Sequence, residues 1–421
     1  MIKSTKVIVY LLRLIWIAFI IKNEYFLFWS SARNCTLSTT QPNVGRFMLV
    51  GDPQMTDDMS YQRHPVIMFF TKYYSQLYMK RNYKHLTKAL KPTDIFMLGD
   101  LMDNGREWND KVYAKEVNRF QKIFPSDNMM IHYMVGNHDI GFGNGIKEHS
   151  LDRFKSYFGS TSYTFNKFGY TFVILDTVSL NSDIPSIQSD AFNLLSTLSN
   201  TTKTLPRILL THVPLYRSPH QSCGPHRQNP VNTIREGAGY QYQNLLTESL
   251  SNYILTSVQP IIVFSGDDHD YCKVIHQYEE QVTVPTFSMS QGLPYPGVVI
   301  VDITDRGELI THLCWLPNQI NIFINYLYMS ILTLLGLFLW HIFQPLLINT
   351  NLIINTFYHQ TSSTTTETPL LPLYTNTTIT NNNNNQRIMS TMKYNLLSFF
   401  YSIQSVAWIG FMLYLICILF L

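Results

Sequence analysis

Two carboxylates spaced three residues apart are the first residues in this sequence that could do chemistry. Asp100 and Asp103 lie in residues 95–105, which read IFMLGDLMDNG. Residues 95–98 form a short apolar run after a turn signal, so we expect a buried strand that ends at Gly99. Open α/β sheets place their ligands just beyond such strands. An ordinary Asp-Gly turn explains the same pattern equally well, so the rest of the chain must decide.

Polar side chains able to bind a metal also follow other apolar runs, at 47–50, 130–135, 208–210 and 261–264. They are, in chain order, Asp52 and Gln54, Asn137 and His138, His212, and Asp267 and His269. A single histidine after a strand is more often a hydrogen-bonded loop residue than a ligand. Five strand ends that all carry carboxylate, amide or imidazole groups are hard to explain as independent loops. Together they predict a metal site at one edge of the sheets.

The elements that must position these residues alternate along residues 43–317. Residues 171–175, 298–303 and 309–315 read as further strands, and residues 66–90 give the clearest helical segment. Strands alternating with helices predict a layered α/β domain with its chemistry at strand ends.

The order DPQ, GDLMDNG, GNHD, TH and GDDHD resembles the calcineurin-like metallophosphoesterases. The resemblance spans essentially the whole folded region. It implies an α/β fold, specifically a four-layer α/β/β/α sandwich with a two-metal site on loops at strand ends. It therefore implies a metal-dependent phosphoesterase, which hydrolyses phosphoric ester bonds.

The resemblance also implies a role for each motif residue. One metal would be bound by Asp52, Gln54 and His269, and the other by Asn137, His212 and Asp267. Asp100 would bridge both ions, because a shared carboxylate screens the repulsion between two nearby cations. His138 matches the catalytic histidine of the family, and Asp103 would hold its imidazole in place. Asp103 could instead cap the turn before Asn104.

Two positions depart from the usual family pattern. Gln54 and Asp267 both stand where the family commonly has histidine. Each change replaces an imidazole by an oxygen donor, if Gln54 binds through its carbonyl, and oxygen donors favour Mn²⁺ or Mg²⁺ over Zn²⁺. We therefore expect two divalent ions, with Mn²⁺ first and Mg²⁺, Fe and Zn²⁺ as alternatives. Gln54 is the least secure ligand.

Composition argues against nucleic acid as a partner. The chain has 421 residues, a net charge of +3 and only 14% charged residues, without a sustained basic stripe. Its 46% hydrophobic residues gather instead in three long apolar segments, which indicates a membrane protein.

The three apolar segments predict membrane spans. Residues 7–28 reach the length of about 20 residues that crosses a bilayer. Arg13 and the lack of a clean cleavage site favour an uncleaved signal anchor over a signal peptide. We expect an anchor and linker at 1–42, the catalytic domain at 43–317, spans at 318–348 and 395–421, and a disordered Thr/Asn-rich loop at 349–394.

Other stretches resemble one branch of the family, the membrane-anchored ER and Golgi phosphoesterases that remove ethanolamine phosphate from a mannose of GPI anchors. They are LYMKRNY from Leu77, RFKSYFG from Arg153, CGPHR from Cys223 and GYQYQNLL from Gly239. This implies GPI-anchored proteins as substrates and a lumenal catalytic domain. The glycosylation sequons at Asn34 and Asn200 agree with a lumenal side. A phosphomonoesterase, a lipid-pyrophosphate phosphatase and a non-catalytic membrane scaffold are the alternatives.

A polar insert at residues 216–242 separates the fourth and fifth motifs and is the expected place for substrate contacts. Arg217, His220 and Arg227 are candidates to bind a phosphodiester, and Tyr240 or Tyr242 could stack on a sugar; solvated loop residues are the alternative for each. Cys223 and Cys272 lie beside two motifs, and we suggest that they form a disulfide.

Overall fold

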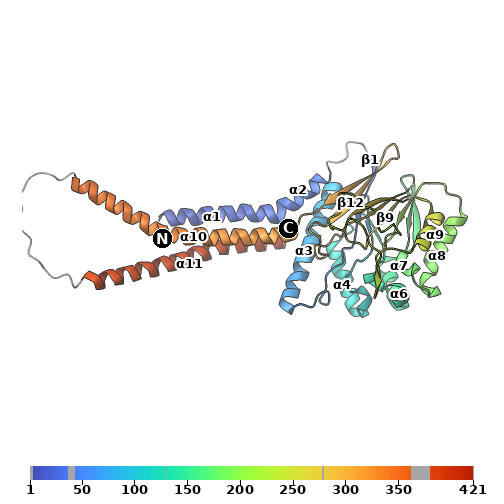
Figure 1. Ribbon diagram of the computed structural model, residues 1–421, viewed down its shortest axis with the longest axis horizontal. Coiled ribbons are helices and arrows are strands. Elements are labelled where there is room, and N and C mark those ends of the chain that lie inside the picture. Colours follow the sequence, from blue (N-terminus) through green and yellow to red (C-terminus); the bar gives the residue numbers. More distant parts are fainter. Residues whose placement is uncertain (1–2, 37–42, 128, 277–278, 362–379, 421) are drawn as a thin grey trace, which may run out of the picture. The chain divides into compact units, whose positions relative to one another are not determined.

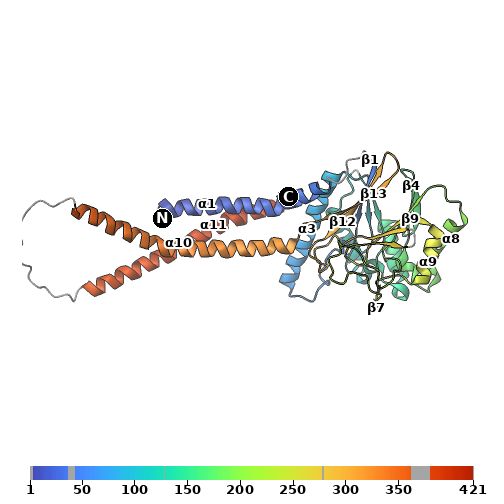
Figure 2. The same ribbon diagram turned by 45° about the horizontal axis from the view of Figure 1, so that its top comes forward.

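The structure, a computed structural model, describes residues 3–36, 43–127, 129–276, 279–361 and 380–420. The chain divides into two compact units (Figure 1, Figure 2). The α/β unit comprises Leu27–Gln319, and the helical unit comprises Met1–Phe26 together with Ile320–Leu421.

Two sheets form the centre of the α/β unit. The first has the order β13 (Leu309–Trp315), β12 (Gly297–Thr304), β1 (Asn43–Val50), β2 (Asp94–Met97) and β3 (Met130–Tyr133). The second has the order β10 (Cys272–His276), β11 (Glu279–Thr283), β9 (Pro260–Ser265), β6 (Arg207–Leu210), β5 (Tyr170–Ile174) and β4 (Tyr163–Lys167). A small hairpin joins β7 (Ala238–Gly239) and β8 (Tyr242–Gln243).

The strands that lead to the expected ligands are parallel to their neighbours. β1, β2 and β3 pair in parallel, as do β6 and β9. Carboxyl ends of parallel strands meet at one edge of a sheet, which brings the loops after them together. β2 and β6 are buried throughout, as central strands covered on both faces require, whereas β3 lies at the edge of its sheet and is partly exposed.

Helices cover the outer faces of both sheets. The helices of the α/β unit are α2 (Leu27–Asn34), α3 (Pro65–Leu90), α4 (Asp110–Ile123), α5 (Asn137–Ile140), α6 (Glu148–Phe158), α7 (Thr177–Leu180), α8 (Pro185–Asn200) and α9 (Glu248–Val258). Of these, α5 and α7 are single turns that follow β3 and β5. Figure 1 shows α3 and α4 on one side of the sheets and α8 and α9 on the other. The α/β unit is therefore a four-layer α/β/β/α sandwich, and the expected fold is confirmed.

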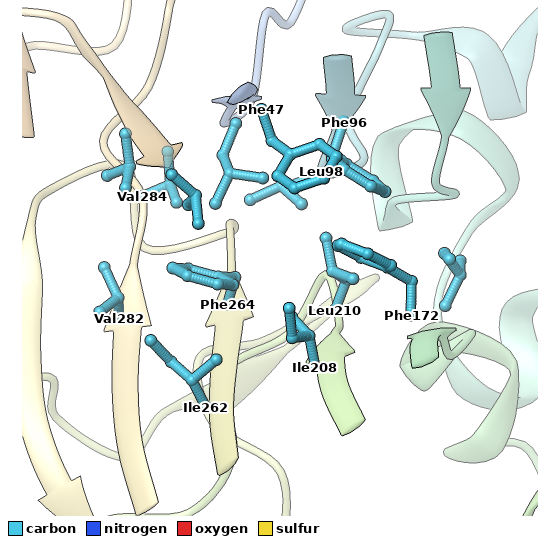
Figure 3. Close-up of a cluster of buried hydrophobic side chains, with 14 of the residues drawn as sticks. Phe47, Phe96, Leu98, Phe172, Ile208, Leu210, Ile262, Phe264, Val282 and Val284 are labelled. Atoms are coloured by element: carbon cyan, nitrogen blue, oxygen red, sulfur yellow. The ribbon is translucent and has the colours of Figure 1, made fainter. Parts of the chain in front are cut away.

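Aromatic side chains fill the space between the two sheets (Figure 3). The ring of Phe172 on the second sheet lies 5.0 Å from the ring of Phe47 and 5.4 Å from that of Phe96 on the first. Burying each such ring contributes about 1.5–3 kcal/mol, so this core fixes how the two sheets align.

The helical unit contains α1 (Lys3–Ile21), the π-helical turn Lys22–Phe26, α10 (Gln319–Thr361) and α11 (Thr380–Phe420). Among the described residues, three helical segments are long and apolar enough to cross a membrane: Ser4–Asn34, Gln319–Phe343 and Lys393–Cys417. Arg13 hydrogen-bonds to Ser405 on α11, so this basic residue in the middle of the first apolar segment has a polar partner.

The helices reach into the segment at 349–394 that was expected to be a disordered loop. α10 continues to Thr361 and α11 begins at Thr380, while residues 362–379 lie outside the described part of the chain. Once a helix exists, each added residue gains a backbone hydrogen bond, so an apolar helix can continue into a polar sequence.

Candidate metal centre

The loops after β1, β2 and β6 bring two carboxylates and one imidazole together. The carboxylates follow β1 and β2, and the imidazole follows β6. One ligand atom from each of Asp52, Asp100 and His212 lies within 4.8 Å of the others, and all three residues are buried. Nε2 of His212 lies 3.1 Å from Oδ1 of Asn137 and 3.5 Å from Oδ1 of Asp267. This cluster of oxygen and nitrogen donors can hold a divalent metal ion.

His212 is oriented for metal binding by a backbone group. Its Nδ1 lies 2.7 Å from the carbonyl oxygen of Leu98, to which it donates, and this leaves Nε2 facing the cluster. Burial lowers the pKa of His212, but the charges of Asp100 and Asp267 outweigh burial and raise it well above its ordinary value. The two carboxylates therefore favour a positive charge at Nε2 of His212, which a bound cation could supply in place of the proton.

Asp100 lies between the two expected ligand sets. Its Oδ1 is 3.4 Å from Nε2 of His212, and its Oδ2 accepts a hydrogen bond of 3.2 Å from the amide of Gln54. The backbone N–H of His138 donates to Oδ1 at 2.9 Å. The bridging role of Asp100 stays a prediction, and its central position suits that role.

Many of the expected ligands share an unusual backbone conformation. Positive φ angles occur at Asp52 (40°), Gln54 (36°), Asp100 (47°), Asp267 (68°) and His269 (66°). Left-handed conformations of residues other than glycine cost of order 1–3 kcal/mol each and cluster at ligand sites. The surrounding fold therefore holds these loops in conformations that aim the side chains into one pocket.

Close packing of Gly136 also requires a residue without a side chain. A Cβ atom at this position would lie 2.1 Å from Oδ1 of Asp100. Any larger residue at position 136 would therefore displace the carboxylate of Asp100.

The unpaired amide oxygen of Gln54 and the buried carboxyl group of Asp52 show whether a cation fits this site. Oε1 of Gln54 is buried and has no hydrogen-bond partner among the described residues. Burial raises the pKa of Asp52 well above its ordinary value, and the neighbouring carboxylates raise it further. A hard divalent cation would satisfy both the amide oxygen and the excess negative charge, so the donor set fits such an ion.

Asp267 and His269 enter the site on the loop after β9. The backbone N–H of Asp267 donates to both carboxylate oxygens of Asp52, each at 3.0 Å. Burial lowers the pKa of His269, which keeps its imidazole neutral and able to bind a metal.

His138 lies beside the cluster with its ring held by Asp103. Nδ1 of His138 donates to the Asp103 carbonyl oxygen at 2.6 Å and lies 3.2 Å from its carboxylate. Burial lowers the pKa of His138, but the charge of Asp100 and the bonds to Asp103 raise it overall to about 9. The imidazole therefore carries a proton at neutral pH in this pocket.

Two residues not given a role from the sequence also shape the site. Asp139 accepts hydrogen bonds from the backbone N–H groups of Gly136, Leu101 and Met102, and so joins the two motif loops. The carbonyl oxygen of Gln241 accepts a bond of 2.9 Å from Nδ2 of Asn137. Asp139 stands inside the GNHD motif, but no local pattern marks Gln241.

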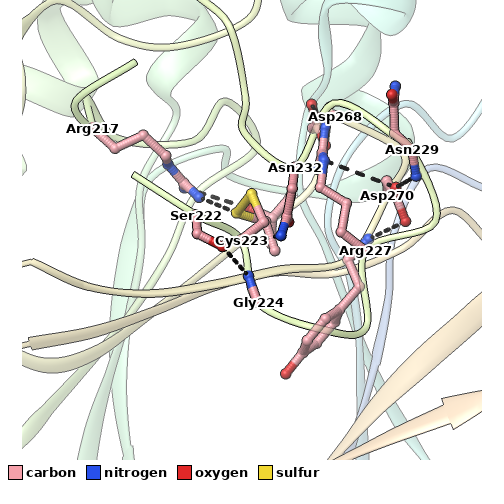
Figure 4. The surroundings of a disulfide bond; sticks show 12 residues. Arg217, Ser222, Cys223, Gly224, Arg227, Asn229, Asn232, Asp268 and Asp270 are labelled. Atoms are coloured by element: carbon pink, nitrogen blue, oxygen red, sulfur yellow. Dashed lines mark hydrogen bonds and ion pairs between the residues drawn. A yellow bond between two sulfur atoms is a disulfide. The ribbon is translucent and has the colours of Figure 1, made fainter. Parts of the chain in front are cut away.

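The insert residues divide into two groups. Arg217 is buried, with Nη1 2.9 Å from Sγ of Cys272, so its position corrects the expectation that it contacts substrate. Nη1 of Arg227 forms an ion pair of 2.6 Å with Asp268 (Figure 4), so its guanidinium is also already bound to a group of the protein. His220 and Tyr240 are exposed.

The suggested disulfide between Cys223 and Cys272 is confirmed, and Figure 4 shows it beside these side chains. It attaches the insert to β10. A second disulfide joins Cys35, just after α2, to Cys314 on β13.

Comparison with known proteins agrees with this geometry. Residues 45–271 match the family model described as calcineurin-like phosphoesterase. The chain is 35% identical to Cell division control protein 1 of Saccharomyces cerevisiae, over 72% of this chain and 68% of the relative. It is 25% identical to Metallophosphoesterase 1 of Mus musculus, over 70% of this chain and 80% of the relative.

The family match covers all the loops that carry the buried donor cluster, including the one that ends in His269. The chain belongs to the calcineurin-like phosphoesterase family and is a metal-dependent phosphoester hydrolase.

Proposed function

We propose that this protein is a two-metal phosphodiesterase that removes ethanolamine phosphate from a mannose of GPI anchors in the secretory pathway. The buried donor cluster of Asp52, Asp100 and His212 is the observation that carries the phosphoesterase chemistry. The sequence blocks that resemble the GPI-remodelling branch and the candidate membrane spans support the choice of substrate.

The chain's own donors would hold two ions, most readily Mn²⁺. Asp52, Gln54 and His269 would bind one ion and Asn137, His212 and Asp267 the other, with Asp100 between them. Bound divalent ions supply Lewis acidity that activates water and stabilises charge on the phosphoryl oxygens.

His138 would move the proton. Its protonated imidazole is held by Asp103 and partly exposed, so it can donate a proton to the leaving oxygen. The bond between phosphorus and the mannose oxygen would break, and a bond from phosphorus to the water oxygen would form. The mannose oxygen would take the proton from His138, and the proton lost by the water would return to the vacated imidazole.

Tyr240 and His220 remain the candidate substrate contacts. Tyr240 is 83% exposed in the turn between β7 and β8, and the next residue, Gln241, contacts Asn137. An exposed aromatic ring beside the donor cluster suits stacking against a sugar.

Two further observations support a lumenal catalytic domain in the ER or Golgi. Disulfides persist in oxidising compartments, and the α/β unit contains two. The sequon residues Asn34 and Asn200 are both exposed, as glycosylation requires.

Structural analysis of GPI glycans from cells that lack this protein tests the proposal. We expect an ethanolamine phosphate branch to persist in these cells and after complementation with His138→Ala, but not with wild type. His149→Ala is the matched control, because His149 is exposed and forms an ion pair with the exposed Asp110. Unchanged branches would reject the GPI substrate, and turnover of simple monoesters or lipid pyrophosphates would then identify the other phosphatase classes.

A further inference from the structure

The first turns of α3 carry an exposed apolar face on the α/β unit. Val66 is 57% exposed, Ile67 55%, Phe69 62% and Phe70 49%, while Met68 is the buried residue of this stretch. Soluble surfaces rarely gather large apolar side chains in this way, and such a patch marks an interaction site.

The aromatic rings of this face form a continuous group. The ring of Phe69 lies 5.5 Å from that of Phe70 and 6.3 Å from that of Tyr73. These residues follow the i, i+3, i+4 and i+7 spacing from Val66, so they lie along one side of the helix. We call Val66, Phe69 and Phe70 the α3 patch.

The polar groups next to the α3 patch are paired among themselves. Lys72 forms an ion pair of 2.7 Å with Asp58, and Arg63 donates to the hydroxyl of Thr71 at 3.2 Å. Residues 65–71 contain no charged side chain. The patch therefore offers apolar contact and no charge to a partner.

The same helix holds both chain segments that lead to the membrane spans. The ring of Phe28, within the first candidate span, lies 5.9 Å from the ring of Tyr78 on α3. The hydroxyl of Tyr78 donates at 2.8 Å to the carbonyl of Pro317, two residues before the second span begins at Gln319.

The α3 patch is close to this attachment. Phe69 precedes Tyr78 by nine residues, which is about 13 Å along a helix at 1.5 Å per residue. An uncharged aromatic patch so near two membrane spans fits a lipid surface.

We propose that the first turns of α3 insert the α3 patch into the membrane interface, as an attachment of the α/β unit to the bilayer in addition to its spans. This attachment limits the rotation of the α/β unit and keeps its metal centre at one height above the membrane. The inference is independent of which phosphoester is cleaved.

Spin labelling of the full-length protein in phosphatidylcholine nanodiscs tests this. In a Cys417→Ser background, Phe69→Cys places a label in the patch, and Met130→Cys places a control label at a residue that is 61% exposed on β3. We expect the ratio of oxygen to nickel-chelate collisions to be severalfold higher for the Phe69 label, because oxygen concentrates in lipid.

Equal ratios at the two positions would overturn the proposal. Spin–spin broadening at the Phe69 position alone would also overturn it, because the patch would then face a second copy of the chain. A functional readout guards against label artefacts. Phe69→Ser/Phe70→Ser should lower turnover of a membrane-embedded substrate severalfold relative to Met130→Ser/Ile275→Ser, with turnover of a soluble diester unchanged in both.

Discussion

Asp100 shows how a single carboxylate can link groups that lie far apart in the chain. Its oxygens contact Gln54, His138 and His212, which come from three different loops. Burial raises the pKa of Asp100, but the charges of His138 and His212 lower it overall, so the carboxylate is ionised. An ionised, buried carboxylate between two donor sets is suited to hold cations.

Asp100→Asn should abolish most of the activity while preserving the fold. Asparagine tolerates the positive φ at this position but lacks the negative charge. Loss of several kcal/mol of transition-state stabilisation corresponds to a fall in kcat/KM of about a thousandfold. Steady-state kinetics and metal analysis measure this effect, with the exposed Asp152→Asn as control. Activity within a few fold of wild type would show that Asp100 does not bridge the ions.

Gln241→Ala should weaken metal binding through Asn137. Oε1 of Gln241 accepts a bond of 2.5 Å from the N–H of Phe142, and this anchor keeps the Gln241 carbonyl on Asn137. Loss of a group that orients a ligand typically costs about 10–100-fold in metal affinity. Calorimetric titration with Mn²⁺ would show it.

Gln259→Ala is the matched control for this prediction. Gln259 also has a positive φ, of 49°, but caps α9 away from the donor cluster. If both variants lost the same affinity, backbone strain and not the Asn137 contact would be responsible.

At the scale of elements, the insert between β6 and β9 is the part of the α/β unit with the most irregular structure. The Cys223–Cys272 disulfide, the Arg227–Asp268 ion pair and the Gln241–Asn137 hydrogen bond connect it to the sheets and the site. The insert thus holds Tyr240 in the short β7–β8 hairpin, next to Gln241, which contacts Asn137.

Cys223→Ser/Cys272→Ser should lower the free energy of unfolding by roughly 2–4 kcal/mol, because the open chain gains conformational entropy when unfolded. Thermal unfolding in detergent measures this, and Cys417→Ser is the control because Cys417 is in neither disulfide. An unchanged midpoint would mean that the remaining insert contacts suffice.

At the scale of the molecule, a buried negative pocket makes the stability of the α/β unit depend on metal. Burial of Asp52 and, after it, repulsion from Asp100 and Asp267 oppose folding, and a bound cation offsets both.

Chelation with EDTA should therefore abolish activity and lower the unfolding midpoint, and Mn²⁺ should restore both. A ligand present at a hundred times its Kd stabilises the folded state by about 2.7 kcal/mol. Differential scanning fluorimetry with and without Mn²⁺ checks this prediction. An unchanged midpoint together with full activity in chelator would contradict a metal centre.

The pattern of disulfides makes a prediction about compartment. Protein taken from cells without reductant and alkylated after unfolding should be modified at Cys417 alone, since Cys35, Cys223, Cys272 and Cys314 are paired. Mass spectrometry identifies the modified residues. Modification of all five cysteines would place the α/β unit in a reducing compartment.

The amino-acid sequence by itself determined the strands that lead to the site, the clearest helix and the residue types at the strand ends, but it did not indicate β4, β10 or β11. These depend on local periodicity, and a buried parallel strand must be apolar before it ends in polar loop residues. The motif order was enough to predict the four-layer fold and the family, and both are confirmed. The approach of Asp52 to Asp100 was also predictable, because β1 and β2 are neighbouring parallel strands that end at the same edge. His212 follows β6 in the other sheet, so its place in the cluster depends on how the two sheets pack.

Only the tertiary structure decided which polar residues face the site. Arg217 and His220 are three residues apart and equally polar, yet the first is buried against Cys272 and the second is exposed. The contact between Gln241 and Asn137 joins residues 104 positions apart. Such contacts follow from how the packed sheets and the disulfide direct an irregular loop, and no local spacing encodes that path.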